Sequence, residues 1–143
     1  MHSLYLSLGT NLGNKRKNLL EAIKRIEKSV GTVLRQSAFI STAPVDFVSE
    51  NDFLNAAILV ETELTPMECL RETQRIEREM GRKRKSINGI HFDRIIDIDL
   101  LTYDDVTLNT PELTLPHPKM HLRDFVMIPL REIMSEERLR RLR

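Results

Sequence analysis

The order of strand-like and helix-like segments is the feature that most constrains the fold of this chain. Apolar residues with helical spacing occur in two main segments, and each of these lies between segments of strand-type composition. The expected elements, in chain order, are a strand at 4–8, a helix at 15–30, strands at 32–41 and 53–62, a helix at 66–80 and a strand at 94–103. This order is that of the split βαβ arrangement, in which helices cover an antiparallel sheet. We therefore expect an α+β sandwich with a ferredoxin-like βαββαβ core and a C-terminal extension, as a single domain over residues 1–143.

Particular residues mark the expected beginning and end of the helix at 66–80. Thr65, Pro66 and Glu68 combine an N-cap, a proline suited to the first helical position and the partner of a capping box. Gly81 stands where this helix should end. In the extension we expect a short strand at 106–108, an irregular proline-containing stretch at 111–118 and a last helix at 123–134.

Composition excludes several classes of protein. The chain has 143 residues and a formal net charge of +1, which argues against a general nucleic-acid binder. The single cysteine, Cys69, excludes an internal disulfide and a multi-cysteine metal site, and its apolar surroundings indicate an inert core residue. The chain shows neither a secretory signal nor an apolar run near the roughly 18 residues of a membrane span. We therefore expect a cytoplasmic protein.

Two aspartates in the last core strand are the most informative polar residues. Asp97 and Asp99 are two positions apart, so both carboxylates project from the same face of a strand. Two carboxylates this close repel each other unless a cation lies between them, and Mg²⁺ typically takes one or two carboxylates together with phosphate oxygens. The alternative is an exposed strand face with two solvated aspartates.

Charge is distributed unevenly around this pair. Residues 71–94 contain eight basic and four acidic side chains, whereas residues 95–112 contain five acidic side chains and no basic one. Arg82, Arg84 and Arg94 flank the expected loop before the aspartates, and guanidinium groups bind phosphate oxygens bidentately. The pattern suits a polyanion bound with a divalent cation. The alternative is a solubilising loop beside a solvated helix face.

Other candidates are weaker when each is taken alone. Phe53 and Asn55 share a face of the third strand, where a ring can stack on a planar heterocycle and an amide can bind its edge, and Phe125 is a second aromatic for such a slot. His117 lies between two prolines and is suited to touching a phosphate. The alternatives are core roles for these residues. One face of the second helix, formed by Leu70, Gln74 and Glu77, either borders a polar site or is an ordinary amphipathic boundary.

Seven segments form a set of motifs: LSLGTNLG (6–13), STAPV (41–45), FLNAA (53–57), TQRIE (73–77), GRKRK (81–85), DRIIDIDLL (93–101) and LTLPHPKMHLRDFVMIPL (113–130). In this order, they resemble the motifs of the 6-hydroxymethyl-7,8-dihydropterin pyrophosphokinases, a family of folate-pathway enzymes. The resemblance covers nearly the whole chain, and DRIIDIDLL followed by LPHP and RDF is its most specific part.

The resemblance implies a monomeric enzyme of ferredoxin-like fold that transfers pyrophosphate from ATP to the pterin hydroxymethyl group. It implies that Asp97 and Asp99 bind two Mg²⁺ ions and that Arg82 and Arg94 act in the chemistry. A pterin slot is implied between Phe53 and Phe125, where Asn55 and the backbone of Thr42 and Val45 would bind the pterin edge. An ATP site is implied at Leu70, Arg71, Gln74, Glu77, Arg84, Arg94, Leu100, Thr114, His117 and Arg123.

The chain departs from the family pattern in one segment. Where members often have Arg-Trp-Gly-Pro-Arg, this chain has Ile-His-Phe-Asp-Arg at 90–94, which changes the expected nucleotide lid.

Two other functions compete with the implied one. A non-catalytic ferredoxin-like binding or regulatory module explains the element order equally well, and a metal-dependent phosphohydrolase would also use the aspartate pair. The small-molecule transferase, with no nucleic-acid or membrane partner, is the function that the sequence favours.

Overall fold

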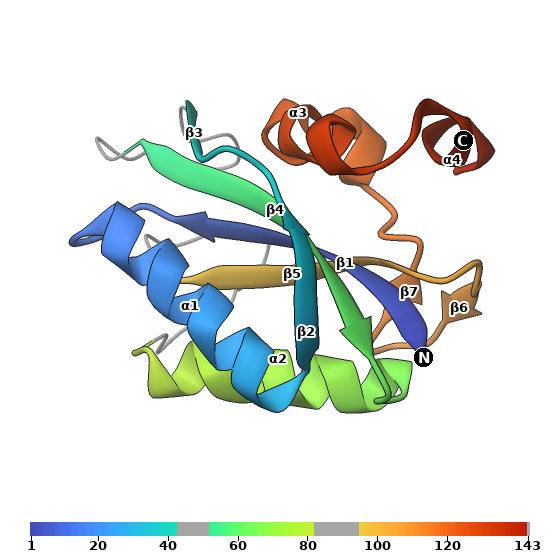
Figure 1. Ribbon diagram of the computed structural model, residues 1–143, viewed down its shortest axis with the longest axis horizontal. Helices are drawn as coiled ribbons and strands as arrows, with labels where there is room; N and C mark the ends of the chain where they lie inside the picture. Colours follow the sequence, from blue (N-terminus) through green and yellow to red (C-terminus); the bar gives the residue numbers. More distant parts are fainter. Residues whose placement is uncertain (43–51, 82–94, 143) are drawn as a thin grey trace.

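A five-stranded antiparallel sheet forms the centre of the computed structural model, which describes residues 1–42, 52–81 and 95–142. Its strand order is β2-β4-β1-β5, and β3 pairs with β4 alongside this path (Figure 1). The strands are β1 (His2–Thr10), β2 (Gly31–Gln36), β3 (Ile40–Thr42), β4 (Phe53–Thr62) and β5 (Asp97–Tyr103). β4 is inserted between β1 and β2, which is the split βαβ order, so the expected ferredoxin-like α+β fold is confirmed.

Helices cover both faces of this sheet (Figure 1). α1 (Lys15–Ser29) and α2 (Pro66–Glu79) pack on one face, while α3 (Asp124–Ile133) and α4 (Glu136–Arg141) lie on the other. Alternate residues of each strand therefore enter two separate cores. Leu6, Ile58 and Ile98 belong to the core beneath α1 and α2, whereas Tyr5, Leu59 and Leu101 belong to the core beneath α3.

The helix starts follow the expected chemistry. The Thr65 hydroxyl accepts the Glu68 N–H at 3.2 Å, and the Glu68 carboxylate accepts the Thr65 N–H at 2.9 Å, so the expected capping box is present. At the other helix of this face, the Asn14 side chain caps α1 by accepting the Lys17 N–H at 3.1 Å. Both helices are thus fixed at the ends from which the chain enters them.

The second strand differs from its expected form. One strand was expected at 32–41, but the structure has β2 and β3 separated by Ser37 and its neighbours. The reason is tertiary: the Ser37 hydroxyl accepts the Ala57 N–H at 2.9 Å, and the Ala38 N–H is taken by the Glu132 carboxylate at 3.2 Å. The Ser37 side chain and Glu132 of α3 thus supply hydrogen bonds at this point in place of regular strand pairing.

The C-terminal extension is more ordered than expected. The short strand lies at β6 (Leu108–Asn109) and pairs with β7 (Thr114–Leu115), inside the stretch expected to be irregular. A 3₁₀ turn, η1 (Met120–Leu122), then leads into α3. The final helix, α4, was not expected at all. No helix in the parts of the chain described here is long and apolar enough to span a membrane.

Candidate functional site

The candidate site is a row of residues that crosses three neighbouring strands. On β1, Gly9 pairs with Asn55 of β4 on one side and with Asp97 of β5 on the other. One step along the sheet, Ser7 pairs in the same way with Ala57 and Asp99. Neighbouring antiparallel strands are about 4.8 Å apart, so the amide and the carboxylates are separated by only two strand spacings.

Gly9 leaves this row open at its centre. A Cβ atom at position 9 would lie 3.0 Å from Asn55 Oδ1 and 3.5 Å from a carbon of the Phe53 ring. Glycine is thus the residue that leaves room for both side chains and for a ligand in close contact with the backbone. The next pair toward Asp99, Ser7 and Ala57, has small side chains that are buried, and Ala57 belongs to the core beneath α3.

Asp97 and Asp99 project from the same face of β5. Both are half-buried, while Ile98 and Leu100 between and after them are buried in the core under α1 and α2. Within the described residues, no group of three or more His, Cys, Asp or Glu side chains could hold a metal. Two hard oxygen ligands on an open face fit Mg²⁺, which usually completes its shell with water and substrate phosphate oxygens.

His117 lies close enough to both Asp97 and Arg123 to interact with them electrostatically. Burial and then the positive charge of Arg123 hold the pKa of His117 below its ordinary value, and the Asp97 carboxylate opposes them. His117 Nδ1 accepts the Lys119 N–H at 3.2 Å, so the neutral ring carries its proton on Nε2. The Arg123 guanidinium lies 5.6 Å from the centre of the Phe125 ring. The site therefore combines an acidic, a basic and an aromatic part.

Three of the expected pterin residues, Thr42, Phe53 and Asn55, lie at the paired ends of β3 and β4. The Asn55 amide is buried and donates from Nδ2 to the Thr42 hydroxyl at 2.6 Å, which fixes the side chain with Oδ1 over Gly9. Phe53 begins β4 on the same sheet face. Phe125 lies on α3, which packs across β4 and β3. The resemblance implies a role for the Thr42 backbone, and the structure adds a contact in which the Thr42 side chain orients the Asn55 amide.

The expected nucleotide residues are distributed over both faces of the sheet. Those on α2 lie on the helix that covers the face opposite to the carboxylates: Leu70 packs against the core, Arg71 is exposed, Gln74 is half-buried and Glu77 is buried. The Leu100 side chain is also in that core, so only its backbone can meet a ligand on the aspartate face. Thr114 lies half-buried in β7, which contacts β5.

Four expected residues fall outside the described ranges. These are Val45, Arg82, Arg84 and Arg94, and the departing segment 90–94 falls there as well. Conversely, sequence reasoning missed Gly9, Ser7 and the side chain of Thr42 as parts of the site. The strand pairing that brings Gly9 between Asn55 and Asp97 is the signal that identifies it, and pairing is not visible in a single sequence.

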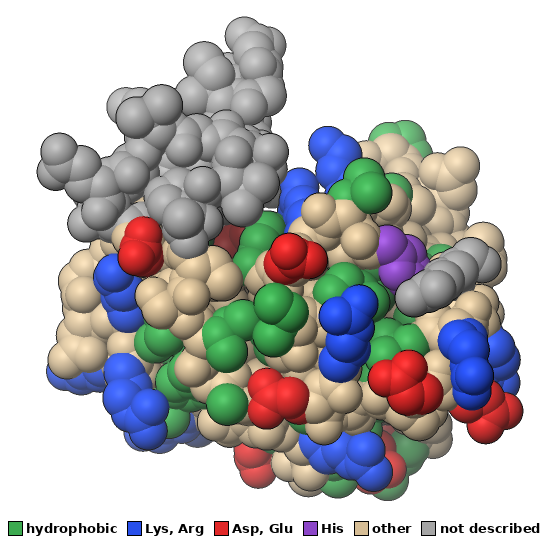
Figure 2. Space-filling model, turned by 90° about the horizontal axis from the view of Figure 1, so that it is seen from above, with side chains coloured by type: hydrophobic (Ala, Val, Ile, Leu, Met, Phe, Trp, Pro, Cys, Tyr) green, Lys and Arg blue, Asp and Glu red, His purple; other side chains and the backbone are tan. Residues whose placement is uncertain are grey.

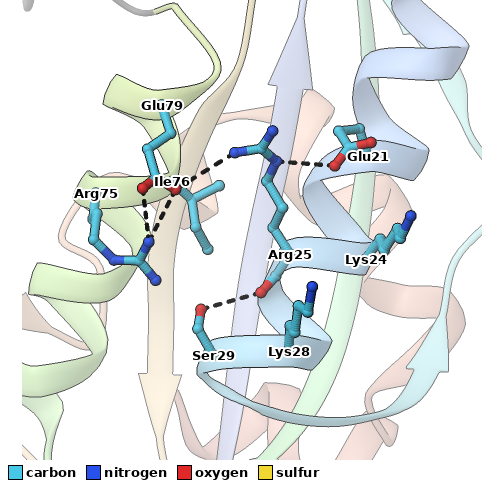
Figure 3. A pocket seen from close by; sticks show the side chains of 8 residues that line it. All are labelled: Glu21, Lys24, Arg25, Lys28, Ser29, Arg75, Ile76 and Glu79. Atoms are coloured by element: carbon cyan, nitrogen blue, oxygen red, sulfur yellow. Dashed lines mark hydrogen bonds and ion pairs between the residues drawn. The ribbon is translucent and has the colours of Figure 1, made fainter.

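A separate hollow lies away from this site, between α1 and α2 (Figure 3). It has a volume of about 280 Å³ and a lining that is mostly charged. Arg25 binds Glu21 at 2.9 Å and Glu79 at 3.4 Å, and Arg75 also binds Glu79 at 2.9 Å. This hollow thus contains a chain of ion pairs that connects the two helices.

On the α3–α4 side, hydrophobic atoms are interspersed with acidic and basic side chains (Figure 2).

A ferredoxin-like sheet that displays two carboxylates and an amide beside a glycine, with an imidazole near one carboxylate, defines a small-molecule site suited to phosphate chemistry. The comparison with known families makes this specific. Residues 5–135 match the family model described as 7,8-dihydro-6-hydroxymethylpterin-pyrophosphokinase. The chain belongs to this family, as the motifs of its sequence indicated.

Relatives cover most of the chain. It is 45% identical over 134 residues to the 2-amino-4-hydroxy-6-hydroxymethyldihydropteridine pyrophosphokinase of Porphyromonas gingivalis, with 93% of this chain and 91% of that protein covered. The Bacillus subtilis enzyme of the same name is 36% identical, with 92% and 78% covered. In fold, wild-type HPPK-DHPS of Plasmodium falciparum matches with a TM-score of 0.71 at 16% identity. That match covers 94% of this chain and 38% of the longer one.

Proposed function

We propose that this protein transfers the β,γ-pyrophosphoryl group of ATP to the hydroxymethyl oxygen of 6-hydroxymethyl-7,8-dihydropterin. The products are AMP and the pterin diphosphate. The family match and relatives of the same name support this reaction. The observation that carries it in the structure is the row Asn55–Gly9–Asp97, because it provides an amide for a heterocycle next to carboxylates for a metal-bound polyphosphate.

The pterin is assigned to the Asn55 end of the row. Asn55 Oδ1 accepts hydrogen bonds from the edge of the heterocycle, because one Nδ2 hydrogen is donated to Thr42 and this bond holds Oδ1 over Gly9. Gly9 lets the ring approach the sheet closely, and Phe53 and Phe125 offer aromatic surfaces for stacking. The expected contact with Val45 completes this assignment.

The triphosphate is assigned to the Asp97 end. Asp97 and Asp99 would hold two Mg²⁺ ions, which neutralise phosphate charge and orient the β-phosphorus when bound. Neutral His117 donates from Nε2 to a phosphate oxygen, and Arg123 adds positive charge on the same side. Arg82, Arg84 and Arg94 are the further cations proposed for the polyphosphate.

The reaction then depends mainly on positioning. The pterin hydroxymethyl oxygen attacks the β-phosphorus, the bond from that phosphorus to the α,β-bridging oxygen breaks, and AMP leaves with the bridging oxygen. The hydroxyl proton is released. Side chains fixed on neighbouring strands hold the two substrates in line, and such alignment supplies a large share of the acceleration.

The remaining expectations extend the same proposal. We assign Leu70, Arg71, Gln74, Glu77, Leu100 and Thr114 to the surroundings of the nucleotide. The protein is proposed to act as a monomer in the cytoplasm, with the whole sequence of 1–143 forming one domain. A phosphohydrolase would use the same carboxylates with water as the nucleophile, so dependence on the pterin separates the two functions.

The test is AMP formation from ATP and Mg²⁺, with and without the pterin. The proposal requires AMP that appears only when the pterin is present and that stops when EDTA removes the metal. Release of phosphate at the same rate without the pterin would favour the phosphohydrolase. Pterin binding without any AMP would favour the non-catalytic binding module.

A further inference from the structure

Glu77 makes an unusual contact with the strand that carries the aspartates. Its Oε2 atom accepts the backbone N–H of Ile98 at 2.8 Å. Ile98 is the residue between Asp97 and Asp99, and the Glu77 side chain is only 6% exposed. A buried carboxylate is therefore bound to the backbone midway between the two proposed metal ligands.

The position of β5 explains why this contact matters. β5 is the last strand in the sheet order, and its partner on the inner side is β1. In an antiparallel pair, alternate residues direct their N–H groups toward the partner strand and the others direct them away. The Ile98 N–H points away from β1 and is taken up by Glu77, which closes the outer edge of the strand at that residue.

The helix that carries Glu77 is itself held in place. Glu79, two residues further along α2, binds Arg75 of the same helix and Arg25 of α1 (Figure 3). Ile76 is buried in the core that α1 and α2 share with Ile98. Glu77 thus connects a fixed helix on one face of the sheet to a strand whose functional carboxylates project from the other face.

We propose that Glu77 is a positioning residue, whose hydrogen bond to Ile98 sets the geometry of Asp97 and Asp99 for the metal ions. This inference depends on the proposed function, since it adds an indirect role in metal binding to the place of Glu77 beside the nucleotide. Outer partners of metal ligands commonly change metal affinity by about 10- to 100-fold when they are removed.

Two substitutions separate the effect of the length of the Glu77 side chain from the effect of its negative charge. Glu77→Gln keeps the length of the side chain and an oxygen acceptor but removes the charge. Glu77→Asp keeps the charge but is one methylene shorter, so its carboxylate cannot reach the Ile98 N–H. Glu79→Gln, in the exposed ion pair on the same helix, is the matched control.

The measurements are Mn²⁺ affinity in the presence of a non-hydrolysable ATP analogue, and amide hydrogen exchange at Ile98 without any ligand. We expect Glu77→Asp to weaken Mn²⁺ binding about tenfold and to accelerate exchange at Ile98. Glu79→Gln should remain close to the parent in both measurements. Glu77→Gln keeps the acceptor oxygen, so it should bind Mn²⁺ more tightly than Glu77→Asp and keep exchange at Ile98 close to that of the parent. Glu77→Ala should behave like Glu77→Asp.

The proposal would be overturned if the two Glu77 variants ranked in the opposite order in Mn²⁺ affinity. If Glu77→Gln loses Mn²⁺ affinity while Glu77→Asp keeps it, the charge of Glu77 acts directly. If neither variant changes exchange at Ile98, the hydrogen bond does not hold the strand. The comparison of Gln with Asp stands even if Glu77→Ala does not fold. Neither measurement needs turnover, so failure here is distinct from failure of the parent protein to form AMP.

Discussion

At the scale of single residues, some site residues can be recognised from their spacing in the sequence, whereas others are recognised only from the residues that lie beside them in the sheet. Asp97 and Asp99 were identifiable because their spacing alone places them on one strand face. Gly9 was not, because its importance arises from Asn55 and Asp97 on the two adjacent strands. A single sequence gives the period of a strand but not the residue that lies opposite each position.

Replacing Asp97 by Asn should remove most of the metal-dependent activity. The amide keeps the shape of the side chain but loses the negative charge that a divalent cation requires. We expect AMP formation to fall by more than the roughly 10- to 100-fold that loss of an outer partner costs a metal site. Assays over a range of Mg²⁺ concentrations measure this, with exposed Asp105→Asn as the control for surface charge. An Asp97→Asn variant with parent activity would remove Asp97 from the metal site.

Replacing Gly9 by Ala should affect the pterin more than ATP. The added Cβ would lie 3.0 Å from Asn55 Oδ1, so the amide must shift or the ring of the ligand must rise from the sheet. Loss of one good hydrogen bond corresponds to about 1.4 kcal/mol, or a tenfold rise in the pterin KM. Steady-state kinetics with each substrate varied in turn measure the effect. An equal rise in both KM values would contradict the assignment of Asn55 to the pterin.

Cys69 should be unreactive in the folded protein. Burial raises the pKa of its thiol to about 11, so at pH 8 nearly all of it is protonated, and the thiolate is the reactive form. We expect a thiol reagent such as DTNB to label the native protein very slowly at pH 8 and to label one thiol per chain promptly in denaturant. Rapid labelling of the native protein at pH 8 would show that Cys69 is accessible.

At the scale of elements, local signals predicted what local forces determine. β4 runs over Phe53–Thr62, as expected from its continuous apolar run, and the start of α2 follows from its capping residues. The break between β2 and β3 could not be predicted, because it depends on contacts of Ser37 and Ala38 with Ala57 and Glu132. Those partners lie about twenty and ninety residues away in the chain.

The capping box of α2 should contribute measurably to stability. Thr65→Ala removes the hydroxyl that accepts the Glu68 N–H, and loss of such a cap costs about 1 kcal/mol. Urea unfolding should show this decrease, whereas Thr65→Ser should restore most of it. The AMP-forming rate of folded protein should stay near that of the parent, because the cap lies at the start of α2, before the residues of this helix that are assigned to the site. A Thr65→Ala variant as stable as the parent would show that the cap has no net effect.

At the scale of the whole molecule, the sheet separates two cores with different roles. Among the residues that the structure describes, the core beneath α1 and α2 contains more buried hydrophobic residues than the core beneath α3, and it supports the sheet on the face opposite to the carboxylates. The core beneath α3 shares its sheet face with Asn55, Asp97 and Asp99. Element order predicted the sheet and its two main helices, but not which face the extension would cover.

The C-terminal helix illustrates the same limit. α4 is short and strongly charged, so no apolar period identifies it. It is stabilised by tertiary contacts: Leu139 is buried in the core beneath α3, and the Arg138 guanidinium lies over the Tyr5 ring and donates to the Asp104 carbonyl. Such contacts join segments far apart in the sequence, which is why pattern reading found the core of the fold and missed its extension.

The most direct test of the account follows the phosphorus atoms of ATP by ³¹P NMR. With Mg²⁺ and 6-hydroxymethyl-7,8-dihydropterin, the account predicts equal amounts of AMP and of a pterin product that carries two linked phosphorus atoms, with no reaction when the pterin is left out. Formation of ADP with a singly phosphorylated pterin, or of free phosphate regardless of the pterin, would contradict it.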